Sequence, residues 1–213
     1  ALIGGAYSST AVTAALASRL RQGEPGPLAT GIALASAVMY LRVALLAAIL
    51  APSVAMPLTI LLTPAAIVAW IASAVAWRFD SRAAGEKPHA PGQPFHLFPA
   101  LLFLLAVAGA ALLVRWAQAE LGALAAAWSL FFAGSFDVDT AIVTLSGLPA
   151  NAIGPQLAAL ALAGTAAVNM AFKIGVAVAN AGWSAGRNAA GALLASEIVL
   201  VLTLLWVLFA FAK

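Results

Sequence analysis

The sequence contains no cysteine and very few charged residues. The absence of Cys among 213 residues excludes disulfides, thiolate metal sites and cysteine nucleophiles. Asp, Glu, Lys and Arg together make up 8% of the chain, whereas hydrophobic residues make up 64%. A soluble domain has roughly 25% charged residues, and no soluble fold of this length could bury so much apolar surface. The composition therefore predicts a protein whose solvent is the lipid bilayer.

Histidine is scarce, and the common catalytic motifs are missing. His89 and His96 both fall in one polar stretch, residues 78–96, and their spacing does not suit a metal site. The chain has no Gly-x-Ser-x-Gly elbow, zincin motif or phosphate loop. We therefore expect neither an enzyme nor a cofactor. The net charge of +3 comes from so few residues that nucleic acid is not an expected partner either.

What the sequence does contain is a series of apolar stretches, and a spanning helix needs about 20 such residues. Five stretches qualify: residues 28–50, 55–77, 98–116, 154–182 and 189–212. Two further stretches, residues 2–20 and 120–148, are apolar but interrupted by polar residues. The sequence thus predicts an all-α polytopic protein, a single membrane domain over residues 1–213 with seven or eight membrane segments.

Three polar loops are expected to join these segments, at residues 19–27, 78–96 and 182–189. If residues 2–20 cross the bilayer and the two halves of residues 120–148 each cross it, six Lys and Arg residues lie on the side of these loops and two on the other. Cytoplasmic loops carry an excess of Lys and Arg. This side is therefore expected to be cytoplasmic.

Two polar stretches far apart in the chain begin alike, which predicts an internal repeat. Residues 5–12 and 134–142 each start with Gly and contain Thr-Ala followed by a β-branched residue. Each leads to a lone cation in an apolar segment, Arg42 in the first copy and Lys173 in the second. Internal repeats with broken helices and buried charges are common in membrane transporters.

The repeat halves would cover about residues 1–77 and 120–213. If residues 120–148 cross the membrane twice, five crossings separate the equivalent helices and the repeat is inverted. A single crossing would make the repeat parallel and would weaken the charge bias. We favour the inverted arrangement.

Carboxylates mark the second copy of the motif. Asp137 is expected to cap the helix that follows a break at Gly134, and Ser8 to cap the equivalent helix of the first copy. In one interpretation, Asp137 and Asp139 serve only to cap the helix and to stabilise its first turn. The alternative makes them oxygen ligands for a cation, including a metal ion, or counter-ions to the buried bases. The sequence leaves both interpretations open.

Arg42 and Lys173 lie deep in their apolar segments, where a charge costs about 2.5–3.5 kcal/mol on insertion scales. A partner or a water-filled cavity is therefore expected, with snorkelling to the interface as the alternative. Asn169 lies one turn before Lys173 on the same helix face, which should point inward. Glu197 lies inside the last apolar segment and is either a proton- or cation-binding carboxylate or a structural partner of a buried base.

The motif at residues 4–13 resembles Gly-Gly-x-x-Ser-Ser-Thr-Ala-Val-Thr of an uncharacterised bacterial membrane family, the domain found C-terminal to MgtC/SapB-type membrane domains. Residues 39–42, residues 137–140 and the spacing of Asn169 and Lys173 also resemble this family, so nearly the whole chain is covered. The resemblance implies a multi-pass protein of the bacterial inner membrane, loosely linked to magnesium physiology. It also implies an MgtC/SapB-type domain before residue 1, so we expect a longer protein.

Together these observations predict a transporter or channel for a small ion. A cation is favoured, namely Mg²⁺, another metal ion or H⁺. The residues expected to face the ion or its path are Asp137, Asp139, Asn169, Lys173, Glu197, Arg42, Ser8, Ser9 and Thr10. Of these, Asp137 and Asp139 are the candidate metal ligands. The alternatives are an anion pathway that uses Arg42 and Lys173, and a non-transporting scaffold or regulatory subunit. The many small residues would also suit a homodimer seam.

Overall fold

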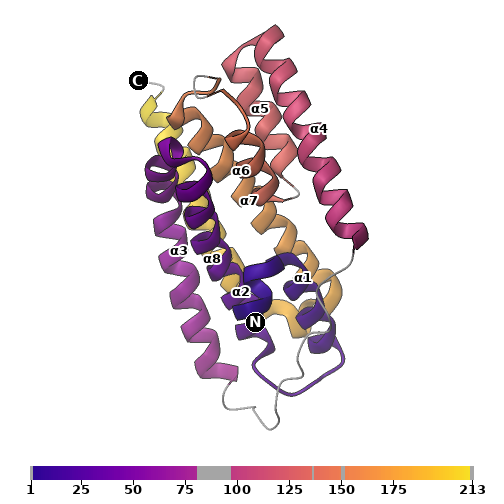
Figure 1. Cartoon of the computed structure of the whole chain (residues 1–213). Coiled ribbons are helices and arrows are strands. Elements are labelled where there is room, and N and C mark those ends of the chain that lie inside the picture. Colours follow the sequence, from indigo (N-terminus) through magenta and orange to yellow (C-terminus); the bar gives the residue numbers. More distant parts are fainter. Residues whose placement is uncertain (1, 81–96, 136, 150–151, 212–213) are drawn as a thin grey trace. The chain divides into compact units, whose positions relative to one another are not determined.

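A computed structural model describes residues 2–80, 97–135, 137–149 and 152–211, and all regular structure in these ranges is helical (Figure 1). The eight helices in this part of the chain are α1 (Leu2–Arg21), α2 (Leu28–Leu50), α3 (Pro52–Asp80), α4 (Leu97–Leu121), α5 (Ala123–Gly134), α6 (Val138–Ser146), α7 (Pro155–Ala181) and α8 (Trp183–Phe211). The all-α prediction is confirmed. The polar loop predicted at residues 78–96 lies outside the described residues from residue 81 onward, and α3 extends through Asp80.

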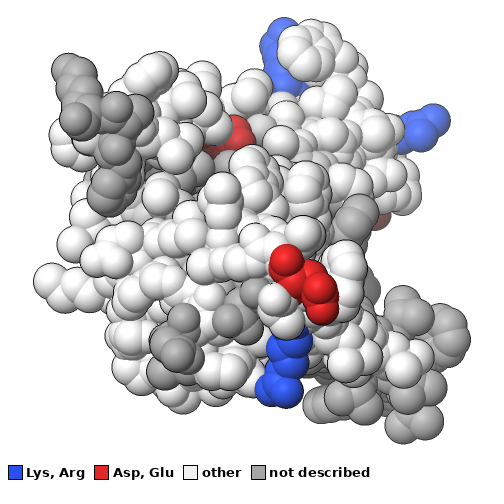
Figure 2. All heavy atoms as spheres, turned by 90° about the horizontal axis from the view of Figure 1, so that it is seen from above, with Lys and Arg blue, Asp and Glu red and all other residues white. Residues whose placement is uncertain are grey.

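Four helices of the described chain are long and apolar enough to cross a membrane: α2, α3, α7 and residues Trp183–Ala210 of α8. α2 covers the same residues that its apolar run predicts. Large apolar side chains point outward on these helices, for example Met56, Trp206 and Phe209, which are 70% exposed or more. Figure 2 shows few charged side chains on the face that it displays. Exposed apolar side chains of this size on long apolar helices fit lipid rather than water. The larger total of seven or eight segments stays a prediction.

The loop predicted at residues 182–189 is wrong, because α7 and α8 are joined by Gly182 alone. Gly182 has φ of 78°, a left-handed conformation that glycine adopts without a steric penalty. Its N–H donates to the Val178 carbonyl at 2.9 Å, and its carbonyl accepts from the Gly186 N–H at 2.8 Å. The polar residues Arg187 and Asn188 therefore lie on α8 itself. Gly122, with φ of 83°, joins α4 to α5 in the same way.

The chain divides into two compact units, and several helices contribute residues to both units. Unit 1 comprises Ala1–Arg42, Thr63–Gly92 and Met170–Thr203, and unit 2 comprises Val43–Leu62, Gln93–Asn169 and Leu204–Lys213. The division does not test the predicted repeat halves, which stay a prediction.

In unit 2, the helices α4, α5 and α6 pack against one another (Figure 1). Gly134, the last residue of α5, is buried where α6 and α7 approach it. A Cβ atom at this position would collide with Ala141 of α6 and would lie 2.9 Å from Cγ2 of Thr165 of α7. The glycine of the second motif therefore allows close helix approach.

In unit 1, most of α2 is interior. Ile32, Ala35 and Ala37 are 0% exposed, and Met39 and Tyr40 are 1% exposed. A helix that is buried on most of its faces belongs to the core of a helical membrane bundle. The polar side chains that α2 carries are therefore held among other helices.

Candidate functional site

Both repeat motifs contain a helix break that is capped by a polar side chain. In the first copy, Ser8 interrupts α1 with φ −156° and ψ 103°, and its Oγ accepts a hydrogen bond from the Ala11 N–H at 3.3 Å. In the second copy, Asp137 has φ −152° and ψ 114°, and its Oδ2 accepts from the Thr140 N–H at 3.3 Å and from the Thr140 hydroxyl at 2.9 Å. The predicted breaks and caps are confirmed, and the two caps have nearly the same backbone conformation.

This local geometry aligns Ser8 with Asp137, and therefore Thr10 with Asp139, one position away from the pairing of Thr10 with Thr140 that the shared Thr-Ala predicts. Thr10 and Asp139 are both half-buried. The first copy thus has a hydroxyl where the second has a carboxylate. The two motifs are thus equivalent in the structure only at their capped helix starts. A repeat over residues 1–77 and 120–213 stays a prediction.

We expect Asp137→Ala to destabilise the protein by about 1 kcal/mol, because the substitution removes an N-cap acceptor. Asp137→Ser keeps a capping oxygen but removes the charge, so it should restore most of this stability. Thermal unfolding in detergent micelles measures both changes. If the serine variant is as unstable as the alanine variant, Asp137 contributes through its charge and not through capping.

The most deeply buried charge in unit 1 is Lys173. Its side chain is 0% exposed, and its Nζ lies 2.8 Å from Sδ of Met39 on α2. A thioether sulfur is a weak acceptor, so this contact offsets little of the desolvation of an ammonium group. Asn169, one turn earlier on α7, is 4% exposed. The prediction that this face of α7 is buried is confirmed.

Next to Met39, the Tyr40 hydroxyl lies within interaction range of Ser196 and of the Glu197 carboxylate, both on α8. The Ser196 hydroxyl itself donates to the Leu193 carbonyl at 2.9 Å. Ser36, one turn before Tyr40 on α2, is 1% exposed, and its Oγ is buried without a hydrogen-bond partner in the described chain. The Tyr40 hydroxyl of α2 thus lies near both Ser196 and the Glu197 carboxylate of α8.

Glu197 itself is half-buried in the spanning part of α8. Its Oε2 is inaccessible to solvent and has no hydrogen-bond partner among the residues that the structure describes. A buried carboxylate oxygen normally has donors around it. This one is therefore the strongest candidate for binding something that is not part of the protein.

The structure divides the predicted site residues between the two units. Unit 1 contains Ser8, Ser9, Thr10, Arg42, Lys173 and Glu197. Unit 2 contains Asp137, Asp139 and Asn169. Ser9 is buried and Arg42 is half-buried.

A metal site at Asp137 and Asp139 would depend on amide or hydroxyl ligands. Within residues 2–80, 97–135, 137–149 and 152–211, no group of three or more His, Cys, Asp and Glu residues is placed to hold a metal ion. One oxygen of Asp137 is also occupied by the cap of α6.

Sequence reasoning missed Ser36, Met39, Tyr40 and Ser196. Ser36 and Tyr40 are separated by one helical turn, and Ser196 directly precedes Glu197. Polar residues at such spacing in apolar segments are the sequence signal that could have indicated a buried polar cluster. This signal was weak because each residue alone is common in a membrane helix.

The fold and these buried polar groups define an all-helical protein whose apolar helices indicate a membrane protein with polar side chains in its core. The family described as "Domain of unknown function (DUF4010)" matches residues 1–181, and the chain belongs to this family. No curated protein matches the chain. No solved structure matches it either.

Proposed function

We propose that the protein moves a small cation across a membrane, as a transporter or a channel, and that Glu197 binds the cation. The observation that carries the proposal is the buried Oε2 of Glu197, which has no hydrogen-bond partner in the described chain. Ionisable groups inside membrane segments are costly and generally mark ion or proton pathways. A passing cation or proton would supply the partner that this oxygen lacks.

The surroundings of Glu197 favour a cation that binds oxygen. Tyr40 brings a hydroxyl oxygen within interaction range of the carboxylate, and Ser196 in turn lies within hydrogen-bond range of Tyr40. Carboxylate and hydroxyl oxygens suit H⁺ and hard cations such as Mg²⁺, which keeps several of its own waters. Asp137, Asp139 and Asn169 remain candidates for a second ion-facing group, in unit 2.

An anion pathway is the second candidate, because unit 1 contains two cations in its membrane segments. Lys173 is completely buried and Arg42 is half-buried. In a cation transporter, these residues would act as an electrostatic barrier or as gating charges. In an anion transporter, they would bind the substrate.

The cellular setting that we propose is the bacterial inner membrane. The protein would be multi-pass there and would work together with an MgtC/SapB-type N-terminal domain or as a homodimer. A scaffold or regulatory subunit without transport is the competing role.

Flux through purified protein in liposomes tests the proposal. We expect the protein to increase the passage of Mg²⁺, another metal ion or H⁺ above that of protein-free liposomes, and Glu197→Gln to remove most of the increase. Flux of chloride or phosphate with no cation flux would instead favour the anion pathway. If neither passes, the transport proposal fails.

A further inference from the structure

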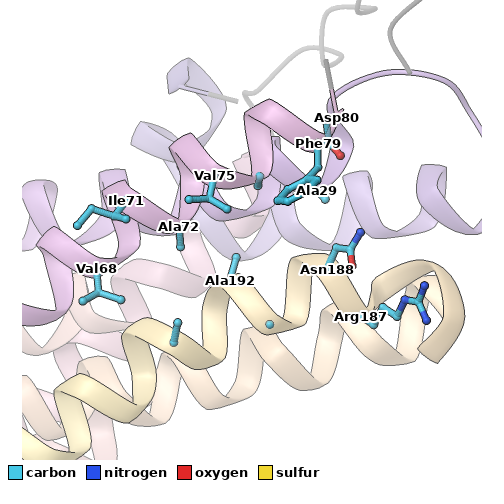
Figure 3. Close-up of a pocket in the computed structure, with 13 residues that line it drawn as sticks. Ala29, Val68, Ile71, Ala72, Val75, Phe79, Asp80, Arg187, Asn188 and Ala192 are labelled. Atoms are coloured by element: carbon cyan, nitrogen blue, oxygen red, sulfur yellow. The ribbon is translucent and has the colours of Figure 1, made fainter. Parts of the chain in front are cut away.

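An open groove in unit 1 lies between α3 and α8 and has an apolar and a polar end (Figure 3). Val68, Ile71 and Val75 line its α3 side, and Gly191 and Ala192 line its α8 side. Its volume is about 570 Å³, which falls within the roughly 300–1,000 Å³ of small-molecule sites. The apolar end therefore has room for a ligand.

The space next to the α8 backbone is empty of protein atoms. Gly191 is exposed, and a Cβ atom added to it would meet no atom within 4 Å. Opposite, Ile71 is 57% exposed and Val75 is 47% exposed. Part of the apolar surface of α3 is thus left uncovered along the groove.

The polar end contains an available cation. Arg187 and Asn188 of α8 lie at the same end of the groove as Asp80 (Figure 3). Hydrogen bonds hold Asp80 to α2, because its Oδ2 accepts from the Thr30 N–H and from the Thr30 hydroxyl, both at 2.9 Å. Arg187 is exposed and forms no salt bridge with any residue that the structure describes.

The length of the groove matches one leaflet of a bilayer. From Val68 to Phe79 the helix rises by roughly 16 Å at 1.5 Å per residue. The hydrocarbon core is about 30 Å thick, so one leaflet is about half of that. The polar end also lies at the terminal residue of α3, where an apolar span gives way to polar sequence.

We propose that this groove binds an anionic phospholipid. One acyl chain lies along Val68, Ile71 and Gly191, and the phosphate binds the Arg187 guanidinium, with the Asn188 amide as a second donor. Arginine binds phosphate oxygens in a bidentate geometry. A second copy of the chain would cover the apolar end but would leave Arg187 without an anion. The distribution of Lys and Arg in the sequence predicts that this end is cytoplasmic, and anionic lipids attract basic residues on that side.

The proposal is independent of ion transport and is tested by lipid retention. Purified protein is reconstituted in nanodiscs of phosphatidylcholine and phosphatidylglycerol in equal amounts, and lipid that stays bound is measured by native mass spectrometry. We expect bound phosphatidylglycerol to exceed bound phosphatidylcholine. Arg187→Gln should lower its retention about fivefold, since one basic residue near an anionic lipid contributes about that factor. Arg21→Gln is the matched control, because Arg21 is exposed and does not line the groove.

Gly191→Leu places a side chain in the groove and should also abolish retention. Leu has a higher helix propensity than Gly, so this variant is expected to keep the thermal stability of the parent, which separates loss of binding from misfolding. Equal retention in the parent, Arg187→Gln and Gly191→Leu would overturn the proposal. Equal binding of both lipids, stabilisation by inorganic phosphate alone, or a dimer that Gly191→Leu disrupts would overturn it as well.

Discussion

Lys173→Met should leave the protein folded and raise its cation flux about tenfold, because a buried positive charge opposes a passing cation. Lys173 is 0% exposed, so its charge is screened little by solvent. Met has a similar length and no charge. A buried substitution that keeps the side-chain volume leaves no large cavity, and such substitutions usually cost less than about 1.5 kcal/mol. Flux in liposomes and thermal unfolding in detergent, measured on the same preparation, give the two readouts.

Lys173→Ala is the matched control for packing. It removes the same charge but leaves a cavity, which typically costs about 2–5 kcal/mol for a large buried side chain. The alanine variant should therefore be clearly less stable than the methionine variant. If Lys173→Met abolishes an anion flux, the anion pathway is correct. If it lowers stability and the parent protein passes no ion, Lys173 only holds helices together.

Gly134→Ala should destabilise the protein by about 1–3 kcal/mol, the usual cost of overpacking a close contact. The new Cβ would collide with Ala141 and would lie 2.9 Å from Cγ2 of Thr165, so α5, α6 and α7 have to move apart. Denaturation in mixed micelles, followed by circular dichroism, measures the loss.

Gly109→Ala provides a control of opposite sign for Gly134→Ala. Gly109 lies within α4 in the same unit, is exposed, and a Cβ there would meet no atom within 4 Å. Since Ala is favoured over Gly in a helix by about 1 kcal/mol, this variant should be neutral or slightly stabilised. Equal effects of the two substitutions would contradict the proposed role of Gly134 in close helix packing.

Local features of the fold could be predicted from the sequence because local chemistry determines them. The apolar run at residues 28–50 fixes the length of α2, and the capping preferences of Ser8 and Asp137 fix where the two motif helices begin. The one-residue turn at Gly182 could not be predicted, because the polar residues that follow it suggest a loop. Only the backbone conformation of Gly182 shows that a single glycine joins α7 to α8.

Contacts between helices were harder to predict from the sequence than these local features. α2 is apolar on nearly all of its faces, so no amphipathic pattern shows which side meets α7 or α8. The approach of Lys173 to Met39 and of Tyr40 to Glu197 depends on the rotation of each helix. The sequence indicates Lys173 and Glu197 by their charge deep inside apolar segments, whereas only the structure shows that the Tyr40 hydroxyl lies near Glu197.

The most direct test of cation transport through Glu197 is the initial rate of cation uptake into liposomes that contain either the parent protein or Glu197→Gln. Glu120→Gln serves as the control, because Glu120 is an exposed carboxylate near the end of α4. We predict that Glu197→Gln lowers the uptake rate at least tenfold while Glu120→Gln leaves it unchanged, since Glu197 has a buried oxygen without a hydrogen-bond partner in the described chain whereas Glu120 is exposed. Equal rates for the parent and Glu197→Gln, with both above protein-free liposomes, would contradict the assignment of Glu197 as the cation-binding group.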